Sequence, residues 1–323
     1  MRHFIHGQQR KAGLYFALIV CINLAIVLII VTGIITGMKG YIGDTRIAYE
    51  SATCSGSICS KCFFSLHTLT TVIPWVCLII LFTGIYLAIR RSLFMLYGNQ
   101  RFIQSLTFLP VENYPELKNI ISRAHLLDLP VYVFKSRSYA AFTSGIWKPK
   151  ISLSTGICSY LTSKELLSVI LHEKHHKENK APLRLVIIRI FCALNFFLPV
   201  NRYLLNMYSS AFEKAADDFA ADTAGDPLEL ASALVRLSNT KNAFAHPPSV
   251  AFSGEKTIVE DRISRLLEIQ TVPPFFNKTH IYLSCLFSFF ISMTICISLF
   301  SQHFAPLYTI DCETNTCHMT ECE

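Results

Sequence analysis

His172-Glu173-Lys174-His175-His176 is an H-E-x-x-H pentad inside residues 166–177, a stretch of helix formers that contains neither Gly nor Pro. On a helix, the first and last histidines of the pentad lie one turn apart on one face, where two imidazoles can bind one zinc ion. Glu173 then stands where a general base is needed for an attacking water. The pentad therefore predicts the core of a metalloprotease site.

A third protein ligand is expected downstream, because a catalytic zinc site combines three ligands with an open position for water. Glu213 and Asp217 are four residues apart, so on a helix both carboxylates project to the same side. We interpret Glu213 as the third ligand of one Zn²⁺ ion, together with His172 and His176. Asp217 is interpreted as the acceptor of the spare N–H of a ligand histidine.

The composition is that of a membrane protein. Of 323 residues, 52% are hydrophobic and only 16% charged, and the mean hydropathy is +0.41. Three uncharged segments are long enough to span about 30 Å of hydrocarbon. They are residues 14–38, 68–89 and 281–300. A fourth apolar segment, residues 183–200, contains Arg184 and Arg189; it is predicted to associate with the membrane, and whether it spans is left open.

The basic residues predict the orientation. Residues 91–279 contain 22 of the 29 Lys and Arg, whereas the tail after residue 300 has none and carries four acidic residues. Since basic residues concentrate on the cytoplasmic side, the central region is expected to face the cytoplasm of a multi-pass protein of the bacterial inner membrane. The loop of residues 39–67 and the C-terminal tail would then both lie outside.

Three parts follow from these patterns. Residues 1–90 form an N-terminal membrane region with two transmembrane helices and an external loop, and residues 91–279 form a cytoplasmic zinc peptidase domain. Residues 280–323 form the last transmembrane helix and an external tail. The predicted fold class is an α-helical membrane protein with a mixed α+β gluzincin-type metallopeptidase domain.

Two cysteine trios fall in the segments that the charges place outside. Disulfides are typical of such an oxidising compartment, and a metal cluster is the alternative reading. The six residues are Cys54, Cys59, Cys62, Cys312, Cys317 and Cys322.

Residues 140–154 are predicted to form a β-hairpin that turns at Ser144-Gly145. Pro149 cannot donate a ladder hydrogen bond, so the strand that holds Ile151, Ser152 and Leu153 is assigned to a sheet edge. A peptide substrate could add to that edge as an extra strand, or the hairpin could be an ordinary one protected by Pro and Lys. The pentad helix is expected to begin with Ser163 as its N-cap, and His175 is expected to be solvated.

The run of residues 141–145, Pro149, residues 151–154, the pentad, and Glu213 with Asp217 resembles the membrane metallopeptidases of the BlaR/MecR antirepressor type. HtpX-type quality-control proteases and CAAX prenyl proteases share the zinc motifs. Those families place a membrane hairpin between pentad and third ligand, and the interval from His176 to Glu213 is too short for two spans. The BlaR/MecR type is therefore favoured.

The resemblance implies a zinc endopeptidase that responds to an external signal and leads to cleavage of a transcriptional repressor. Its partners would be a protein or peptide substrate, such as a winged-helix repressor, and the lipid bilayer, with no direct nucleic-acid binding. Antibiotic-sensing members carry a penicillin-binding domain after the last span, and no such sequence follows residue 302 here. The alternatives are an HtpX-type quality-control protease and a non-proteolytic membrane receptor with a zinc site.

Overall fold

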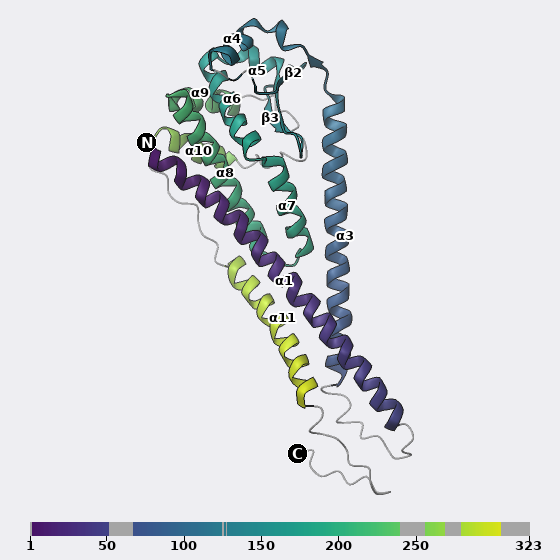
Figure 1. The fold of residues 1–323 in the computed structure, drawn as a ribbon. Helices are drawn as coiled ribbons and strands as arrows, with labels where there is room; N and C mark the ends of the chain where they lie inside the picture. The colour runs from purple at the N-terminus through teal and green to yellow at the C-terminus, as the bar shows by residue number, and fades with distance from the viewer. Residues whose placement is uncertain are drawn as a thin grey trace, which may run out of the picture. The chain divides into compact units, whose positions relative to one another are not determined.

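A computed structural model describes residues 2–51, 67–124, 126, 128–239, 256–268 and 279–304. This part of the chain is mostly helical and contains one small sheet (Figure 1). The elements are α1 (Arg2–Ser51), α3 (His67–Ser105), β1 (Phe108–Leu109), η1 (Val111–Asn113), α4 (Pro115–Arg123), β2 (Val131–Phe134), β3 (Ala141–Ser144), β4 (Lys150–Ser154), α5 (Thr155–Tyr160), α6 (Ser163–Glu178), α7 (Ala181–Leu194), α8 (Val200–Ala224), α9 (Pro227–Ser238), α10 (Lys256–Leu266) and α11 (Thr279–Phe304).

The chain folds as two compact units. The first comprises residues 1–20, 88–192 and 201–276, and the second comprises residues 21–87, 193–200 and 277–323. The first unit holds the sheet, the pentad and the helices around them. It also includes the amino-terminal turns of α1, which belong to the same helix as the first predicted span.

Of the described helices, two contain segments long and apolar enough to cross a membrane, Gly7–Met38 and Pro74–Ser105. They coincide with the first predicted span and overlap the second, which indicates a membrane protein. The third predicted span lies within α11. In contrast, α7 has 14 residues, which at 1.5 Å per residue is about 21 Å and too short to cross the hydrocarbon.

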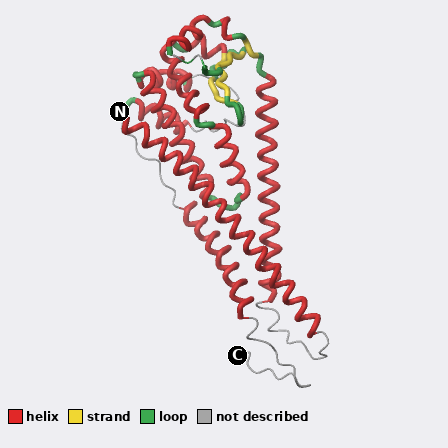
Figure 2. Tube along the Cα trace, in the orientation of Figure 1, coloured by secondary structure: helices red, strands yellow, loops and turns green. Residues whose placement is uncertain are grey.

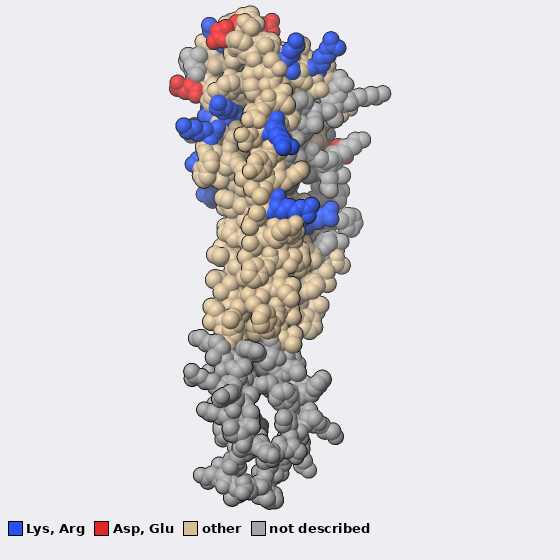
Figure 3. Space-filling model, turned by 90° about the vertical axis from the view of Figure 1, so that its right-hand side faces the viewer, with Lys and Arg blue, Asp and Glu red and all other residues tan. Residues whose placement is uncertain are grey.

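The second unit has an apolar interior in which small residues allow close packing. Ile26, Ile30 and Ile34 of α1 are buried against Cys77 and Leu198. A Cβ atom added at Gly84 would meet the carbonyl oxygen of Leu194, so the backbones approach as closely as glycine permits. On the face drawn in Figure 3, the blue and red charged side chains give way to a stretch of tan surface that carries no Lys, Arg, Asp or Glu.

Within the described residues, four strands form one sheet in the order β1-β2-β4-β3 (strands yellow in Figure 2). The predicted hairpin is confirmed, since β3 pairs antiparallel with β4, with Ser144 opposite Lys150. The edge assignment was wrong. Ile151, Ser152 and Leu153 lie in an interior strand, because β4 also pairs in parallel with β2.

The misassignment has a physical cause in the position of Pro149. This proline precedes the first residue of β4, so its missing N–H is not required by either ladder. Parallel pairing with β2 joins strands that are distant in sequence, and periodicity within one strand carries no sign of it. The edges of the sheet are β1 and β3, and β3 packs beside α6.

The pentad helix α6 begins one residue earlier than predicted. Its N-cap is Thr162, whose side chain accepts a hydrogen bond from the Glu165 backbone N–H, while the Glu165 carboxylate accepts one from the Thr162 backbone. This reciprocal capping box satisfies two N–H groups that a helix start leaves open. Ile170, which is fully buried, anchors the helix in the core of the first unit together with Leu166 and Leu171.

Candidate metal site

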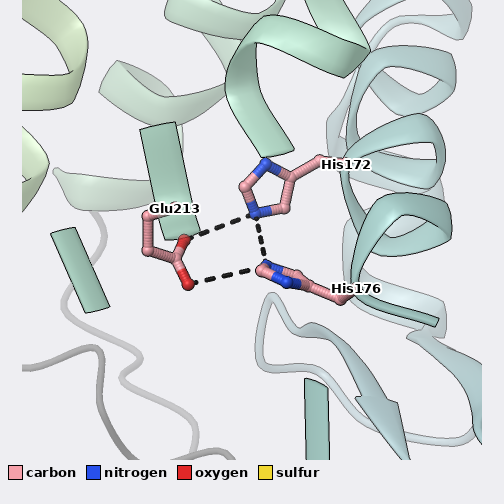
Figure 4. A group of neighbouring side chains, drawn as sticks. All are labelled: His172, His176 and Glu213. Atoms are coloured by element: carbon pink, nitrogen blue, oxygen red, sulfur yellow. Dashed lines mark hydrogen bonds and ion pairs between the residues drawn. The ribbon is translucent and has the colours of Figure 1, made fainter. Parts of the chain in front are cut away.

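Two neighbouring helices bring three candidate ligand side chains to one point (Figure 4). His172 and His176 come from α6 and Glu213 from α8, and their ligand atoms all lie within 4.8 Å of one another. The Nε2 atoms of the histidines are 3.0 Å apart. Glu213 places Oε2 at 3.4 Å from His172 Nε2 and Oε1 at 3.5 Å from His176 Nε2.

These separations suit one zinc ion. A tetrahedral ion with bonds of about 2.0–2.1 Å to nitrogen and oxygen places its ligand atoms about 3.3 Å apart. The donors are two imidazoles and one carboxylate, which leaves a fourth position open, as in catalytic rather than structural zinc sites. The prediction of one zinc ion at His172, His176 and Glu213 is therefore confirmed at the level of geometry and donor chemistry.

Asp217 supports the first ligand histidine from behind. Its Oδ1 atom lies 3.0 Å from His172 Nδ1, the ring nitrogen that faces away from the ligand cluster. A carboxylate in this place fixes the tautomer of the ring and keeps Nε2 free for the metal. The role predicted for Asp217 matches this contact.

Arg262 of α10 is a member of the site that the sequence did not reveal. Its guanidinium donates to both oxygens of Asp217, at 2.7 and 2.8 Å, and lies 3.0 Å from Glu213 Oε2. Arg262 is buried, and such a forked pairing is the strongest ion-pair geometry available to arginine. It stands 45 residues after Asp217 in an amphipathic helix whose sequence contains no ligand motif.

Glu173 is held by the edge strand β3. The Thr143 hydroxyl lies 2.8 Å from Glu173 Oε2 and 3.0 Å from the Glu173 carbonyl oxygen. The single hydroxyl proton is donated to one of these oxygens at a time, and when it goes to Oε2, Oε1 is the carboxylate oxygen left to accept a proton. Burial raises the pKa of Glu173, which brings the carboxyl toward the range useful for a general base.

The two ligand histidines have opposite pKa shifts. Burial opposes protonation of His172, but its hydrogen bonds to Asp217 and Glu213 raise its pKa to about 9. Burial lowers the pKa of His176 to about 4. Against the effect of burial, the charge of Arg262 holds the pKa of Glu213 well below its usual range.

The charges of the site favour a dication. Two buried carboxylates, those of Glu173 and Asp217, and the half-buried carboxylate of Glu213 face one guanidinium, that of Arg262. When the three carboxylates are ionised and both ligand histidines are neutral, as metal binding requires, two negative charges remain without a counter-charge among these residues. Buried charge of this kind is stable only when it is paired or bound to a metal.

His175 is buried, and the prediction that it is solvated was wrong. It is 5% exposed, and its ring lies 5.6 Å from the rings of both Phe212 and Phe219. Its Nε2 atom is 3.0 Å from Gln9 Oε1. The sequence did not show this environment because all three partners belong to other helices.

Of the remaining predicted residues, only the three of strand β4 lie in the described part of the chain, and they are not part of the metal cluster. Ile151, Ser152 and Leu153 lie within the sheet interior. The two cysteine trios fall outside the described residues.

Comparison with known proteins bears on the same region. Residues 115–270 match Peptidase family M48, and this interval contains the pentad, Glu213, Asp217 and Arg262. The central region is a Peptidase family M48 domain. A search among curated proteins found no match.

The M48 domain and the ligand cluster together identify a zinc metalloendopeptidase. The match to Peptidase family M48 does not show that the domain is of the BlaR/MecR type. The interval from His176 to Glu213 is occupied by α7, a turn and the first half of α8, and α7 is too short to span the hydrocarbon.

Proposed function

We propose that this M48 domain is the catalytic part of a membrane-bound endopeptidase in which Glu173 is the general base. The observation that carries the proposal is the pairing of three converging ligand atoms with a buried carboxylate on the adjacent residue. When bound, zinc would supply Lewis-acid activation of a water molecule and of the scissile carbonyl.

The residues of the chain have separate tasks in this reaction. His172, His176 and Glu213 would hold the ion, and Asp217 would orient His172. Glu173, held at Oε2 by Thr143, would take a proton from the attacking water at Oε1 and return it to the leaving amine. The edge strand β3 lies beside α6 and would be the strand along which an extended peptide could align.

The proposed orientation places this domain in the cytoplasm. It is supported by the concentration of Lys and Arg in residues 91–279 and by their absence from the C-terminal tail. The proposed substrate is a cytoplasmic regulator such as a transcriptional repressor, and this choice rests on the sequence resemblance to the BlaR/MecR type.

A quality-control protease of the HtpX type is a second candidate. It is supported by the zinc motifs that this type shares with the chain. The membrane hairpin of that type has no counterpart here, because α7 is too short to cross the hydrocarbon. Substrate breadth separates the two functions. A regulatory enzyme cleaves one folded partner at one site, whereas a quality-control enzyme degrades many unfolded chains.

The general-base role is tested with the full chain in detergent. Glu173→Gln keeps the size of the side chain but removes the basic oxygen, so we expect proteolysis to fall by about 10²- to 10⁴-fold. Zinc content should stay at one ion per chain, because Glu173 is not a ligand. Glu178→Gln, at the exposed end of the same helix, is the matched control and should retain activity.

Two substrates complete the experiment, unfolded casein and a co-encoded repressor where one exists. Cleavage of the repressor alone supports the regulatory function, and cleavage of casein alone supports quality control. Full activity of Glu173→Gln on either substrate contradicts the mechanism.

A further inference from the structure

We propose that the amino-terminal turns of α1, residues 9–19, are a structural part of the zinc site, and that Gln9 is a positioning residue for the pentad helix. The inference rests on the proposed function. It concerns how the ligand set is held in place, and both partners in the contact belong to the first unit.

Gln9 bridges two residues at the end of α6. Its Nε2 donates to Asn179 Oδ1 at 2.7 Å, and its Oε1 lies 3.0 Å from His175 Nε2. Asn179 Nδ2 in turn donates to the His175 carbonyl oxygen at 2.9 Å. Since an amide oxygen can only accept, His175 carries its proton on Nε2. These hydrogen bonds form a closed ring through the side chains of Gln9 and Asn179 and through both the imidazole and the backbone carbonyl of His175.

This ring fixes the turn that carries a zinc ligand. His175 immediately precedes His176, and Asn179 is the C-cap of α6. The last turn of a helix lacks partners for its final carbonyl groups and frays unless side chains hold it. Gln9 therefore stabilises the turn from which His176 reaches the metal position.

A second contact connects α1 to the other ligand helix. The ring of Phe16 lies 6.1 Å from that of Tyr208, which stacks on Phe212 at 5.4 Å with an interplanar angle of 15°. Phe212 immediately precedes Glu213, and its ring lies 5.2 Å from that of His176. The aromatic contacts thus run from α1 through Tyr208 to Phe212, which contacts the ligand His176.

The contact surface of α1 is a continuous helix face. Gln9, Ala12, Phe16 and Ile19 follow the three- and four-residue spacing of one face. Ala12 and Ile19 are fully buried. A packed stripe with polar and aromatic contacts at defined places is expected where two helices must hold one fixed register.

The substitution Gln9→Leu tests the positioning role, because it keeps the bulk of the side chain and removes both hydrogen bonds. It leaves the buried His175 N–H and the half-buried Asn179 oxygen without their Gln9 partner, which favours a shift of the last turn of α6. Gln8→Leu makes the same chemical change at the neighbouring residue, for which the described part of the chain shows no side-chain hydrogen bond.

The experiment uses the full chain in detergent with Co²⁺ in place of zinc, and then with zinc restored. The visible absorption of Co²⁺ reports the geometry of its ligands directly. We expect Gln9→Leu to alter this spectrum and to lower kcat on casein by about tenfold, with KM unchanged, as for residues that orient metal ligands indirectly. Gln8→Leu should match the wild type in both measurements.

The Co²⁺ spectrum distinguishes this inference from the proposed function. If the wild type binds Co²⁺ but cleaves nothing, the proposed function fails, while the spectra still decide whether Gln9 positions the ligands. A wild-type spectrum for Gln9→Leu, or an equal change with Gln8→Leu, overturns the positioning role. Should Gln9→Leu not fold, Asn179→Ala opens the same ring from the α6 side and must give the altered spectrum.

Discussion

The first unit buries ionised groups beside the metal site, whereas the described part of the second unit buries a pair of uncharged amides. Asp217 is 1% exposed and is bonded through both oxygens to the buried guanidinium of Arg262. In the second unit, Asn195 Nδ2 donates to Asn23 Oδ1 at 2.9 Å and to the Asn23 carbonyl oxygen at 3.0 Å. Both asparagines are fully buried.

The difference follows from what each unit has to hold. Burying an ionised group costs several kcal/mol unless its charge is matched, so a cluster of such groups is typical of a site that binds a charged species. A neutral amide pair fixes two segments in an apolar environment without that cost. Buried ionised groups thus mark the catalytic unit, and a buried neutral pair suits the described segments of the second unit that can cross a membrane.

Of the substitutions that test this difference between the two units, Arg262→Leu should lower the free energy of unfolding most. It leaves Asp217 ionised and buried without its main counter-charge, a loss of about 3–5 kcal/mol in the free energy of unfolding. The measurement is the thermal unfolding transition of the zinc-loaded chain in detergent, monitored by intrinsic fluorescence.

Arg265→Leu is the control for that change, since Arg265 lies on the same helix and pairs with Asp218 at a partly exposed position. Such a pair contributes about 1 kcal/mol or less. Equal losses of thermal stability for Arg262→Leu and Arg265→Leu would show that the buried pair stabilises the fold no more than the partly exposed pair.

Asn195→Leu should have a smaller effect. It removes the two hydrogen bonds that the Asn195 amide donates to Asn23, and one such bond between neutral groups within a membrane contributes about 0.6 kcal/mol on average. The thermal transition should shift slightly, and zinc content and proteolysis should stay at the wild-type level.

A double-mutant cycle sharpens this prediction. If Asn23 and Asn195 act as a pair, the double change to Leu costs no more than the larger single change. Additive losses would mean that each amide is stabilised by other partners, and a loss of zinc from Asn195→Leu would contradict the separation of roles.

The ligand residues were predictable because their spacing is local. His172 and His176 are four residues apart on α6, and Glu213 and Asp217 are four residues apart on α8. Such helical spacing can be recognised from the sequence alone. Arg262 and Gln9 were not predictable, because each contacts the site from a helix far away in the chain and neither belongs to a motif.

The errors have the same origin. Pro149 was read as evidence for an edge strand, although β4 is placed in the sheet interior by parallel pairing with a distant strand. His175 was read as solvated, although aromatic side chains of α8 and the Gln9 amide bury it. Local chemistry predicts which residues can bind a metal, and tertiary packing decides which neighbours support them.

X-ray absorption at the zinc edge of the purified full chain tests the central claim most directly. Coordination by His172, His176 and Glu213 predicts nitrogen and oxygen neighbours at about 2.0–2.1 Å and no sulfur. This pattern should disappear in Glu213→Ala. A sulfur shell at about 2.3 Å would instead place the ion on cysteines and contradict the assignment.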